Sequence, residues 1–392
     1  MSEVRVNNLS NENNTGGPTI SGITTYSGTH FFVPPQGDTA SRPQSCPSGS
    51  LRFNTDTYHL EYYRGDGIGW IELEAELTKE LGGGGGTGFG SNFGLGIRGL
   101  WAGGSTPSVT NQIDQYTLST LGDGVDFGDL IAATAQPRGL SSRTRALFGG
   151  GYSPNDSTKT NKIDYVIFAT TGQKYDFGNL LSSKVGSAPF SNEIRGIWAG
   201  GTPGTVDNVI QYVTISTTGH AKDFGDSSNV NYAGDALASS TRGVHALGLD
   251  PPNSNTRINV LDTVEIMSTG NATDFGDLTH KRMPCGAASN ATRGLFGHGE
   301  DASTRVNTID YITIATKGNA IDFGDNITSV QNCQSSACSS PTRAVWGGGS
   351  TPSKTNTMDK VEIMTTGNAV DFGDLITARS DVTAASNGHG GL

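Results

Sequence analysis

The chain of 392 residues carries a formal net charge of −11, and only 16% of its residues are charged, against 34% that are hydrophobic. This acidic balance argues against a nucleic-acid partner, because binding to a phosphate backbone rests on Lys and Arg. The 56 glycines favour many short strands joined by tight turns rather than helices. The first residues lack the apolar segment of a signal peptide, and no run of about 18 apolar residues follows, so we expect a soluble protein without a membrane span.

Residues 1–80 form the first predicted module, built around the stretch LRFNTDTYHLEYYRGDGIGW. This stretch predicts two or three short strands separated by turns at NTDT and RGDG, with Phe53, Tyr62 and Trp70 alternating inward. The RGD tripeptide at Arg64–Asp66 matches an integrin-binding motif, but a hairpin turn accounts for it. A module of this size buries little surface alone. We therefore expect it to pack on a partner or on copies of itself.

The lead-in TASRP…PSGS is followed by LRFNTDT, EYY and a final Trp, and the match that these residues carry covers residues 25–75. This pattern resembles a module near the N-terminus of fibre and other structural proteins of tailed phages, especially phages of marine cyanobacteria. The resemblance implies that residues 1–80 attach the protein to a virion. The glycine-rich residues 81–96 that follow are expected to form a flexible linker.

Residues 97–392 contain a sequence repeat. The tetrapeptide DFGD, or DFGN in one unit, recurs at steps of 50, 47, 51, 48 and 49 residues. A second marker keeps the same period: an Arg followed by small, aliphatic and aromatic residues and then glycines. The repeat therefore predicts six units. The marker residues are Phe127, Phe177, Phe224, Phe275, Phe323 and Phe372, with Arg98, Arg145, Arg195, Arg242, Arg293 and Arg343.

Each unit predicts four strands. A small-residue segment forms the first strand, the repeated Arg begins the second, alternating residues such as IDYITIAT form the third, and DFG lies in the fourth. A TKGN or TTGN turn joins the last two, where Gly can take the positive φ of a tight hairpin. Four strands at this period indicate a β-propeller. The glycine pairs and TG turns resemble kelch repeats, which implies a kelch-like propeller over residues 97–392 but no particular function.

The ends of the repeat predict how the ring closes. The first unit has no convincing first strand before Ile97, whereas the C-terminal SDVTAASNGHGGL aligns with the first strand of the other units. We expect residues 381–387 to supply the missing inner strand, which removes an exposed sheet edge. The predicted fold is all-β: a six-bladed, kelch-like propeller closed by its C-terminal strand, preceded by a small β-rich anchoring module and a linker.

The DFG tripeptide also occurs in protein kinases, where its Asp holds magnesium, and Asp322 lies in such a segment. Phosphoryl transfer needs further elements, and no HRD segment is present. Six copies also disfavour catalysis at one of them. We expect the Phe to pack between blades, the Gly to permit a bend and the Asp to accept hydrogen bonds in the turn. A calcium-like ion held by Asp in some blades is the alternative, and Asn179 marks the unit least suited to it.

The repeated Arg allows two interpretations. Six Arg side chains on one face could form an anion or glycan site, or each Arg could pair at its turn with a blade Asp or with backbone carbonyls.

His245 and His298 replace residues of the second strand, where a core or surface role is more common than ligation. No CxxC or HExxH motif is present, so no zinc site is expected. No GxSxG motif of a serine nucleophile occurs either. The cysteines are Cys46, Cys285, Cys333 and Cys338.

Two classes of function follow from these patterns. The first is a non-enzymatic structural and binding protein of a phage particle, assembled in the host cytoplasm, in which residues 1–80 bind other virion proteins. The propeller, as a tail fibre, receptor-binding appendage or capsid decoration, would bind a host-surface glycan or protein through loops that differ between blades. The protein could also form homo-oligomers.

The second class is a carbohydrate-active propeller enzyme, which needs two carboxylates about 5–10 Å apart in a pocket. Many carboxylates of this chain lie in the repeated DFGD segments, which favours a structural role for them. We therefore predict no catalytic residue, cofactor or metal.

Overall fold

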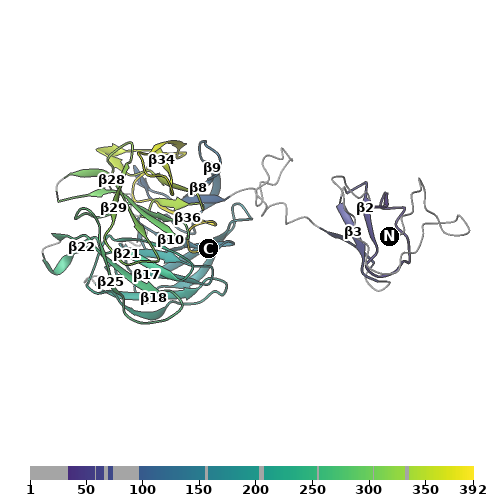
Figure 1. The fold of residues 1–392 in the computed structure, drawn as a ribbon, viewed down its shortest axis with the longest axis horizontal. Coiled ribbons are helices and arrows are strands. Elements are labelled where there is room, and N and C mark those ends of the chain that lie inside the picture. The colour runs from purple at the N-terminus through teal and green to yellow at the C-terminus, as the bar shows by residue number, and fades with distance from the viewer. Residues whose placement is uncertain are drawn as a thin grey trace, which may run out of the picture. The chain divides into compact units, whose positions relative to one another are not determined.

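The structure is a computed structural model that describes residues 34–57, 59–65, 69–73, 97–154, 158–202, 207–253, 256–302, 304–331 and 335–392. The chain divides into two compact units, Met1–Thr78 and Lys79–Leu392. The regular structure of the described residues is β-strand, apart from the 3₁₀ turn Pro251–Asn253 (Figure 1). These residues contain no helix with the length and apolar character that crossing a bilayer requires. The predicted linker, residues 81–96, lies outside them.

The N-terminal unit contains a sheet in the order β1-β2-β3-β4, in which β1 is parallel to β2 and the other neighbours are antiparallel. The predicted NTDT turn lies between β2 and β3, whereas the predicted RGDG turn falls partly outside the described residues. The strands are β1 (Gln36–Gly37), β2 (Leu51–Asn54), β3 (His59–Tyr63) and β4 (Trp70–Leu73).

The prediction that Phe53, Tyr62 and Trp70 share the inner face of this sheet is wrong. Strand pairing places Trp70 opposite Tyr63, and Tyr62 opposite Leu51. Because successive side chains of a strand point to opposite faces, Tyr62 and Trp70 lie on different faces. Phe53 and Tyr62 are half exposed, and a polar network fills the inner face instead. The buried residues of β2 and β3 are Arg52, Asn54, Glu61 and Tyr63.

In the C-terminal unit, the described residues form six four-stranded antiparallel sheets, one for each predicted sequence unit. Sheets 1 to 6 are named here in chain order of their second strands, which begin at the repeated Arg. Sheet 1 comprises β36 (Thr383–Ser386), β5 (Arg98–Ala102), β8 (Gln112–Thr117) and β9 (Val125–Asp129). Sheet 2 comprises β10 (Arg138–Ser141), β11 (Arg145–Gly149), β14 (Lys162–Ile167) and β15 (Lys174–Asn179). Sheet 3 comprises β16 (Ala188–Ser191), β17 (Arg195–Ala199), β18 (Val209–Thr214) and β19 (Lys222–Asp226).

The remaining sheets follow the same plan. Sheet 4 comprises β20 (Asp235–Ala238), β21 (Arg242–Ala246), β24 (Val260–Glu265) and β25 (Thr273–Asp277). Sheet 5 comprises β26 (Ala287–Ser289), β27 (Arg293–Glu300), β28 (Arg305–Thr313) and β29 (Ile321–Asp325). Sheet 6 comprises β30 (Ala337–Ser339), β31 (Arg343–Gly347), β34 (Thr357–Glu362) and β35 (Val370–Asp374).

Short hairpins extend the connection between the second and third strands of several sheets. They are β6 (Ser105–Thr106) with β7 (Ser108–Val109), β12 (Tyr152–Ser153) with β13 (Thr158–Lys159), β22 (Leu249–Asp250) with β23 (Thr256–Arg257), and β32 (Ser350–Thr351) with β33 (Ser353–Lys354). In sheet 5 the second and third strands are themselves longer and form a continuous hairpin. The connections on this side of the sheets therefore differ from one sheet to the next.

The expectation that the C-terminus supplies the missing strand of the first sheet is confirmed. Thr383 pairs with Ala102 and Ser386 pairs with Gly99, so β36 is the first strand of sheet 1 (Figure 1). First strands also contact the first strands of both neighbouring sheets, in the order β36, β10, β16, β20, β26, β30 and back to β36. Their small, buried residues let the backbones approach closely at this centre.

Candidate functional site

The six repeated phenylalanines fill the spaces between neighbouring sheets. Phe127 of sheet 1 lies in a buried cluster with Phe148 and Val166 of sheet 2, and Phe372 of sheet 6 lies in one with Trp101 and Tyr116 of sheet 1. Each Phe is the extra residue of a β-bulge between the third and fourth strands. The bulge lets the fourth strand twist and turn its Phe toward the next sheet.

The backbone of the DFG segment is bound by the next sheet. In all six cases the Phe carbonyl accepts a hydrogen bond from the glycine N–H of the next turn between third and fourth strands, at 2.6 to 3.1 Å. In three sheets, an Asn of the same turn accepts the N–H of the residue after DFG: Asn271 from Asp226, Asn319 from Asp277 and Asn368 from Asp325. The turn thus covers the outer edge of the preceding sheet, an edge that would otherwise expose unpaired backbone groups.

The aspartates that precede the six phenylalanines are exposed. Asp126 and Asp176 each accept the N–H of the glycine two residues later, at 3.2 Å. The described residues contain no group of three His, Cys, Asp or Glu side chains arranged to hold a metal ion. At Asn179 the backbone N–H donates to His220 Nδ1 at 3.1 Å, so this unit makes the same turn contact with a different side chain.

Each repeated Arg also bridges to the next sheet. Its guanidinium donates to the carbonyl that directly follows the third strand of that sheet, at 2.6 to 3.1 Å. The acceptors of Arg98, Arg145, Arg195, Arg242, Arg293 and Arg343 are Phe168, Ile215, Ile266, Ile314, Ile363 and Leu118. Of the two interpretations of this ring, these contacts favour pairing with backbone carbonyls over an anion site.

A third set of contacts between sheets was not recognised in the sequence. A side-chain oxygen on the third strand accepts the N–H of the residue two positions beyond the fourth strand of the preceding sheet, at 2.7 to 3.1 Å. The acceptors are Asp114, Asp164, Gln211, Asp262, Asp310 and Asp359. The sequence does contain a signal for this contact: each third strand has a polar residue at the same position, directly after an apolar one.

The carboxylates of this set differ in their burial and in their charged partners. Asp114 pairs with Arg379 at 2.6 Å and Asp310 with Arg282 at 3.0 Å, all four side chains being fully buried. Asp164 forms no ion pair within the described part of the chain, and burial raises its pKa to about 6. Asp164 is only partly buried, but desolvation still penalises its charge and favours the neutral form.

Ser227, which follows β19 of sheet 3, lies beside His245 and Asp262 of sheet 4, but the three do not form a catalytic triad. His245 Nε2 lies 3.0 Å from Ser227 Oγ and 3.8 Å from Asp262 Oδ2, so one nitrogen faces both groups. In a triad the carboxylate must instead bind Nδ1, leaving Nε2 to take the proton of the serine. His245 Nδ1 is buried without a hydrogen-bond partner, and its side chain is fully buried. A substrate therefore has no access to this serine.

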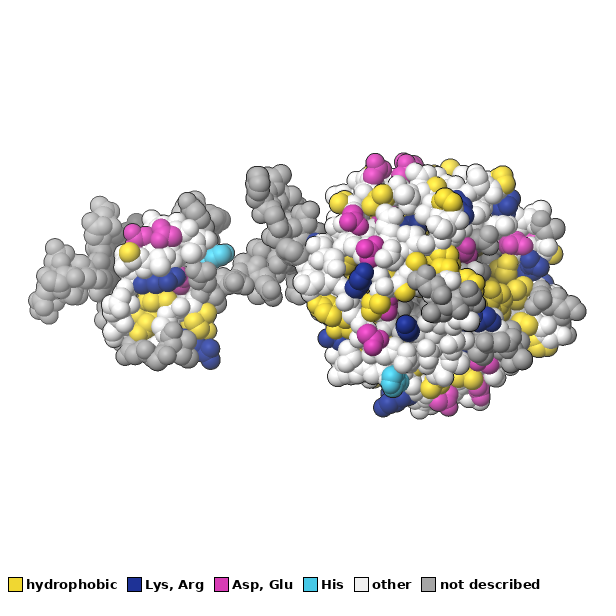
Figure 2. All heavy atoms as spheres, turned by 180° about the vertical axis from the view of Figure 1, so that it is seen from behind, with side chains coloured by type: hydrophobic (Ala, Val, Ile, Leu, Met, Phe, Trp, Pro, Cys, Tyr) yellow, Lys and Arg dark blue, Asp and Glu magenta, His cyan; other side chains and the backbone are white. Residues whose placement is uncertain are grey.

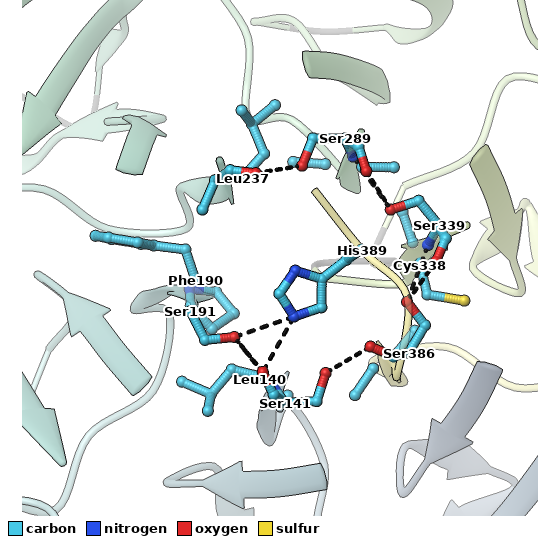
Figure 3. A pocket seen from close by; sticks show the side chains of 18 of the residues that line it. Leu140, Ser141, Phe190, Ser191, Leu237, Ser289, Cys338, Ser339, Ser386 and His389 are labelled. Carbon is cyan, nitrogen blue, oxygen red and sulfur yellow. Dashed lines mark hydrogen bonds between the residues drawn. The ribbon is translucent and has the colours of Figure 1, made fainter. Parts of the chain in front are cut away.

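The centre of the C-terminal unit encloses a cavity of about 60 Å³ (Figure 3). The first strands line it with serines whose hydroxyls bond neighbouring strands: Ser191 donates to the Ser141 carbonyl at 2.7 Å and Ser386 to the Ser339 carbonyl at 2.6 Å. His389 points into this ring of side chains. This volume leaves room for a few water molecules rather than for a typical organic substrate.

The neutral form of His389 suits its position at this cavity. Nε2 donates to the Ser141 carbonyl at 3.0 Å, and Nδ1 accepts the N–H of Gly391 at 3.1 Å. Since one nitrogen donates and the other accepts, the imidazole satisfies both contacts without a charge. Burial accordingly lowers the pKa of His389 to about 4. This histidine therefore lines the cavity as a structural, uncharged group.

The polar network of the N-terminal unit uses the residues that defined its sequence motif. Glu61 is fully buried and receives hydrogen bonds from Arg42 and from Asn54, the latter at 2.7 Å. Burial alone would raise the pKa of Glu61, but these hydrogen bonds outweigh it and lower the pKa. The Trp70 indole donates to the Pro43 carbonyl at 3.0 Å. The SRP lead-in and the final Trp therefore belong to one folded core.

Comparison with models of known protein families finds no match, and no curated protein matches this sequence. The class is therefore defined by the structure: an all-β protein with two compact units, each built from small sheets.

Proposed function

We propose that residues 97–392 form a six-bladed, kelch-like β-propeller, and that the protein is a non-enzymatic structural and binding component of a tailed-phage particle. The propeller is supported by the interface between sheet 6 and sheet 1. There Gly122 donates to the Phe372 carbonyl, Arg343 to the Leu118 carbonyl, and the Ile376 N–H to Asp114, each at 3.1 Å. These are the contacts made at the other five interfaces, so each sheet has equivalent neighbours, as the blades of a closed ring do.

The observation that carries a non-enzymatic role is the location of the repeated polar residues. The repeated Arg residues and the polar residues of the third strands bind backbone groups of neighbouring sheets. The cavity at the centre has a volume of about 60 Å³. A glycan-cleaving enzyme would need two carboxylates facing one pocket. Four cavities lined by described residues each contain at most one carboxylate: none at the centre, and Asp164, Asp359 and Asp123 in the others.

The N-terminal unit supports a separate attachment role. Its sheet has its own buried network around Glu61, and the residues of the phage-type motif build that network. Leu51 on the outer face is 49% exposed, and Phe53, Leu60 and Tyr62 beside it are only partly buried. An apolar face on so small a unit suits docking to another virion protein.

The attachment role predicts that removing residues 1–80 abolishes incorporation into particles and leaves the propeller folded. Purified particles would be probed for the truncated and the full-length protein with an antibody to the propeller, and the near-ultraviolet circular dichroism of the truncated protein would report its fold. Immunogold labelling of intact particles would place the full-length protein on capsid or tail. Particles that still contain the folded, truncated protein would contradict the proposal.

A further inference from the structure

Sheet 1 departs from the repeat beside its Arg. In sheets 2, 3 and 5 the guanidinium lies over a tyrosine ring of the third strand, with its central carbon 4.4 to 5.0 Å from the ring centre. The pairs are Arg145 with Tyr165, Arg195 with Tyr212 and Arg293 with Tyr311. Stacking of this kind fills the space next to the guanidinium and is favourable because the ring face is electron-rich.

Sheets 4 and 6 use an acidic residue instead. Arg242 binds Glu265 at 3.1 Å and Arg343 binds Glu362 at 3.0 Å. In sheet 1 strand pairing places Gln115 at the position of the tyrosine and Thr117 at the position of the glutamate. Neither side chain can replace an aromatic ring in volume.

A cavity of about 180 Å³ lies at this position, three times the volume of the central one. It is lined by Arg98, Gln115, Thr117, Thr120, Asp123 and Val125, among others. Val125 is 59% exposed and Leu121, also in the lining, is 61% exposed, so apolar side chains form open walls. Gln115 Oε1 is buried and has no hydrogen-bond partner. An unpaired buried acceptor is costly, and a ligand hydroxyl would satisfy it.

We propose that this cavity binds one pyranose ring of a glycan, which rests on the proposed role of the propeller in host-surface binding. A sugar ring combines hydroxyls, which both donate and accept, with C–H faces that pack on apolar walls. Gln115 accepts from a hydroxyl, Thr117 and Thr120 supply further hydroxyls, and Asp123 accepts from another. Arg98 and Asp123 bring one positive and one negative charge to the lining, so a neutral sugar fits this charge pattern better than a phosphate. The volume, three times that of the central cavity, suits a single ring.

Gln115→Tyr tests the site by restoring the side chain that sheets 2, 3 and 5 carry. The tyrosine should fill the cavity, stack on Arg98 and leave the fold intact. The matched control is Lys360→Tyr, which places the same residue at the equivalent position of sheet 6. A second variant, Asp123→Asn, removes the charge but keeps the acceptor for the Asp374 N–H, since Asn holds this turn position in sheets 4, 5 and 6.

Binding would be measured on the full-length protein by saturation-transfer NMR, with a panel of free hexoses, deoxyhexoses and N-acetylhexosamines as probes. At least one sugar should bind the wild type, Gln115→Tyr should weaken it at least tenfold, Asp123→Asn should weaken it several-fold, and Lys360→Tyr should leave it unchanged. No binding of any sugar to the wild type, or equal binding by Gln115→Tyr, would overturn the site. Adsorption of the protein to host cells, measured in parallel, reports the proposed binding function separately. If Gln115→Tyr adsorbs as well as the wild type, the sugar site is wrong, whereas the proposed role in host-surface binding is unaffected.

Discussion

Replacing Asp164 by Asn should change how the stability of the protein depends on pH. The carboxylate accepts the Ile131 N–H at 2.9 Å, and burial raises its pKa from 3.8 to about 6. Between these two values the folded state binds more protons than the unfolded chain. Stability therefore falls as the pH rises through this window, and it stays lower above it.

The magnitude follows from the size of the pKa difference. At about 1.4 kcal/mol per pKa unit, a rise from 3.8 to about 6 corresponds to about 3 kcal/mol of unfolding free energy. Asn does not titrate and keeps an oxygen for Ile131. Gln211 shows that a carboxamide serves in this place, because it accepts the Leu181 N–H at 2.8 Å in sheet 3. Any fixed cost of the new NH₂ group is the same at every pH and cancels from the comparison.

Urea unfolding at several values between about pH 3 and about pH 7 would measure this difference. Fluorescence of the buried Trp101, Trp198 and Trp346 reports the C-terminal unit. The stability of Asp164→Asn relative to wild type should rise by about 3 kcal/mol across this range, whereas Asp126→Asn, at an exposed carboxylate, is the control and should show no such rise. A constant difference for Asp164→Asn would refute the assignment of a desolvated charge.

Three further outcomes are expected. The wild type should lose stability as the pH falls from 6.5 to about 4, because in this range only the unfolded chain protonates His389. His389→Gln should not show this loss, and urea denaturation at both ends of the range would measure the difference. Gly324→Ala should cost about 2 kcal/mol or more in thermal denaturation, since φ is +143° and the added Cβ would lie 2.5 Å from the Gly367 carbonyl oxygen; an unchanged midpoint would argue against this packing. Deleting residues 381–392 should give an aggregated protein in gel filtration, because β5 loses a neighbour, and a folded monomer would contradict that role for β36.

The features that could be predicted from the sequence are those carried by a repeated side chain or by alignment. The DFG period marked the fourth strands, and SDVTAASN matched the first strands of other units closely enough to place β36 in sheet 1. For the repeated Arg residues, pairing with a blade Asp or with backbone carbonyls was one of two interpretations, and the structure shows backbone carbonyls as acceptors. Their acceptors could not be named, because a carbonyl such as that of Phe168 lies 70 residues from Arg98 and every residue has one.

The features that escaped prediction depend on partners without a side-chain signature. Asp164 binds the backbone N–H of Ile131, so only one half of the contact is visible in the sequence. In the N-terminal unit, aromatic residues were assigned to the inner face because burial of apolar area usually decides the face of a strand. In this sheet the buried Glu61, which accepts hydrogen bonds from Arg42 and Asn54, determines which face of β3 points inward. Tyr62, the next residue of the strand, must therefore face outward. The cavity beside Gln115 emerges only when the six sheets are compared.

The pairing of β5 with β36 has a consequence for synthesis of the chain. Residues 98–102 leave the ribosome about 285 residues before residues 383–386, the strand that completes their sheet. At about 5–20 residues per second, that interval is about 15 to 60 s. During this interval Trp101, which is fully buried in the finished fold, lacks part of the contacts that bury it. The N-terminal sheet, whose four strands are all made by residue 73, can fold during this interval, whereas sheet 1 is necessarily completed only when β36 has been made.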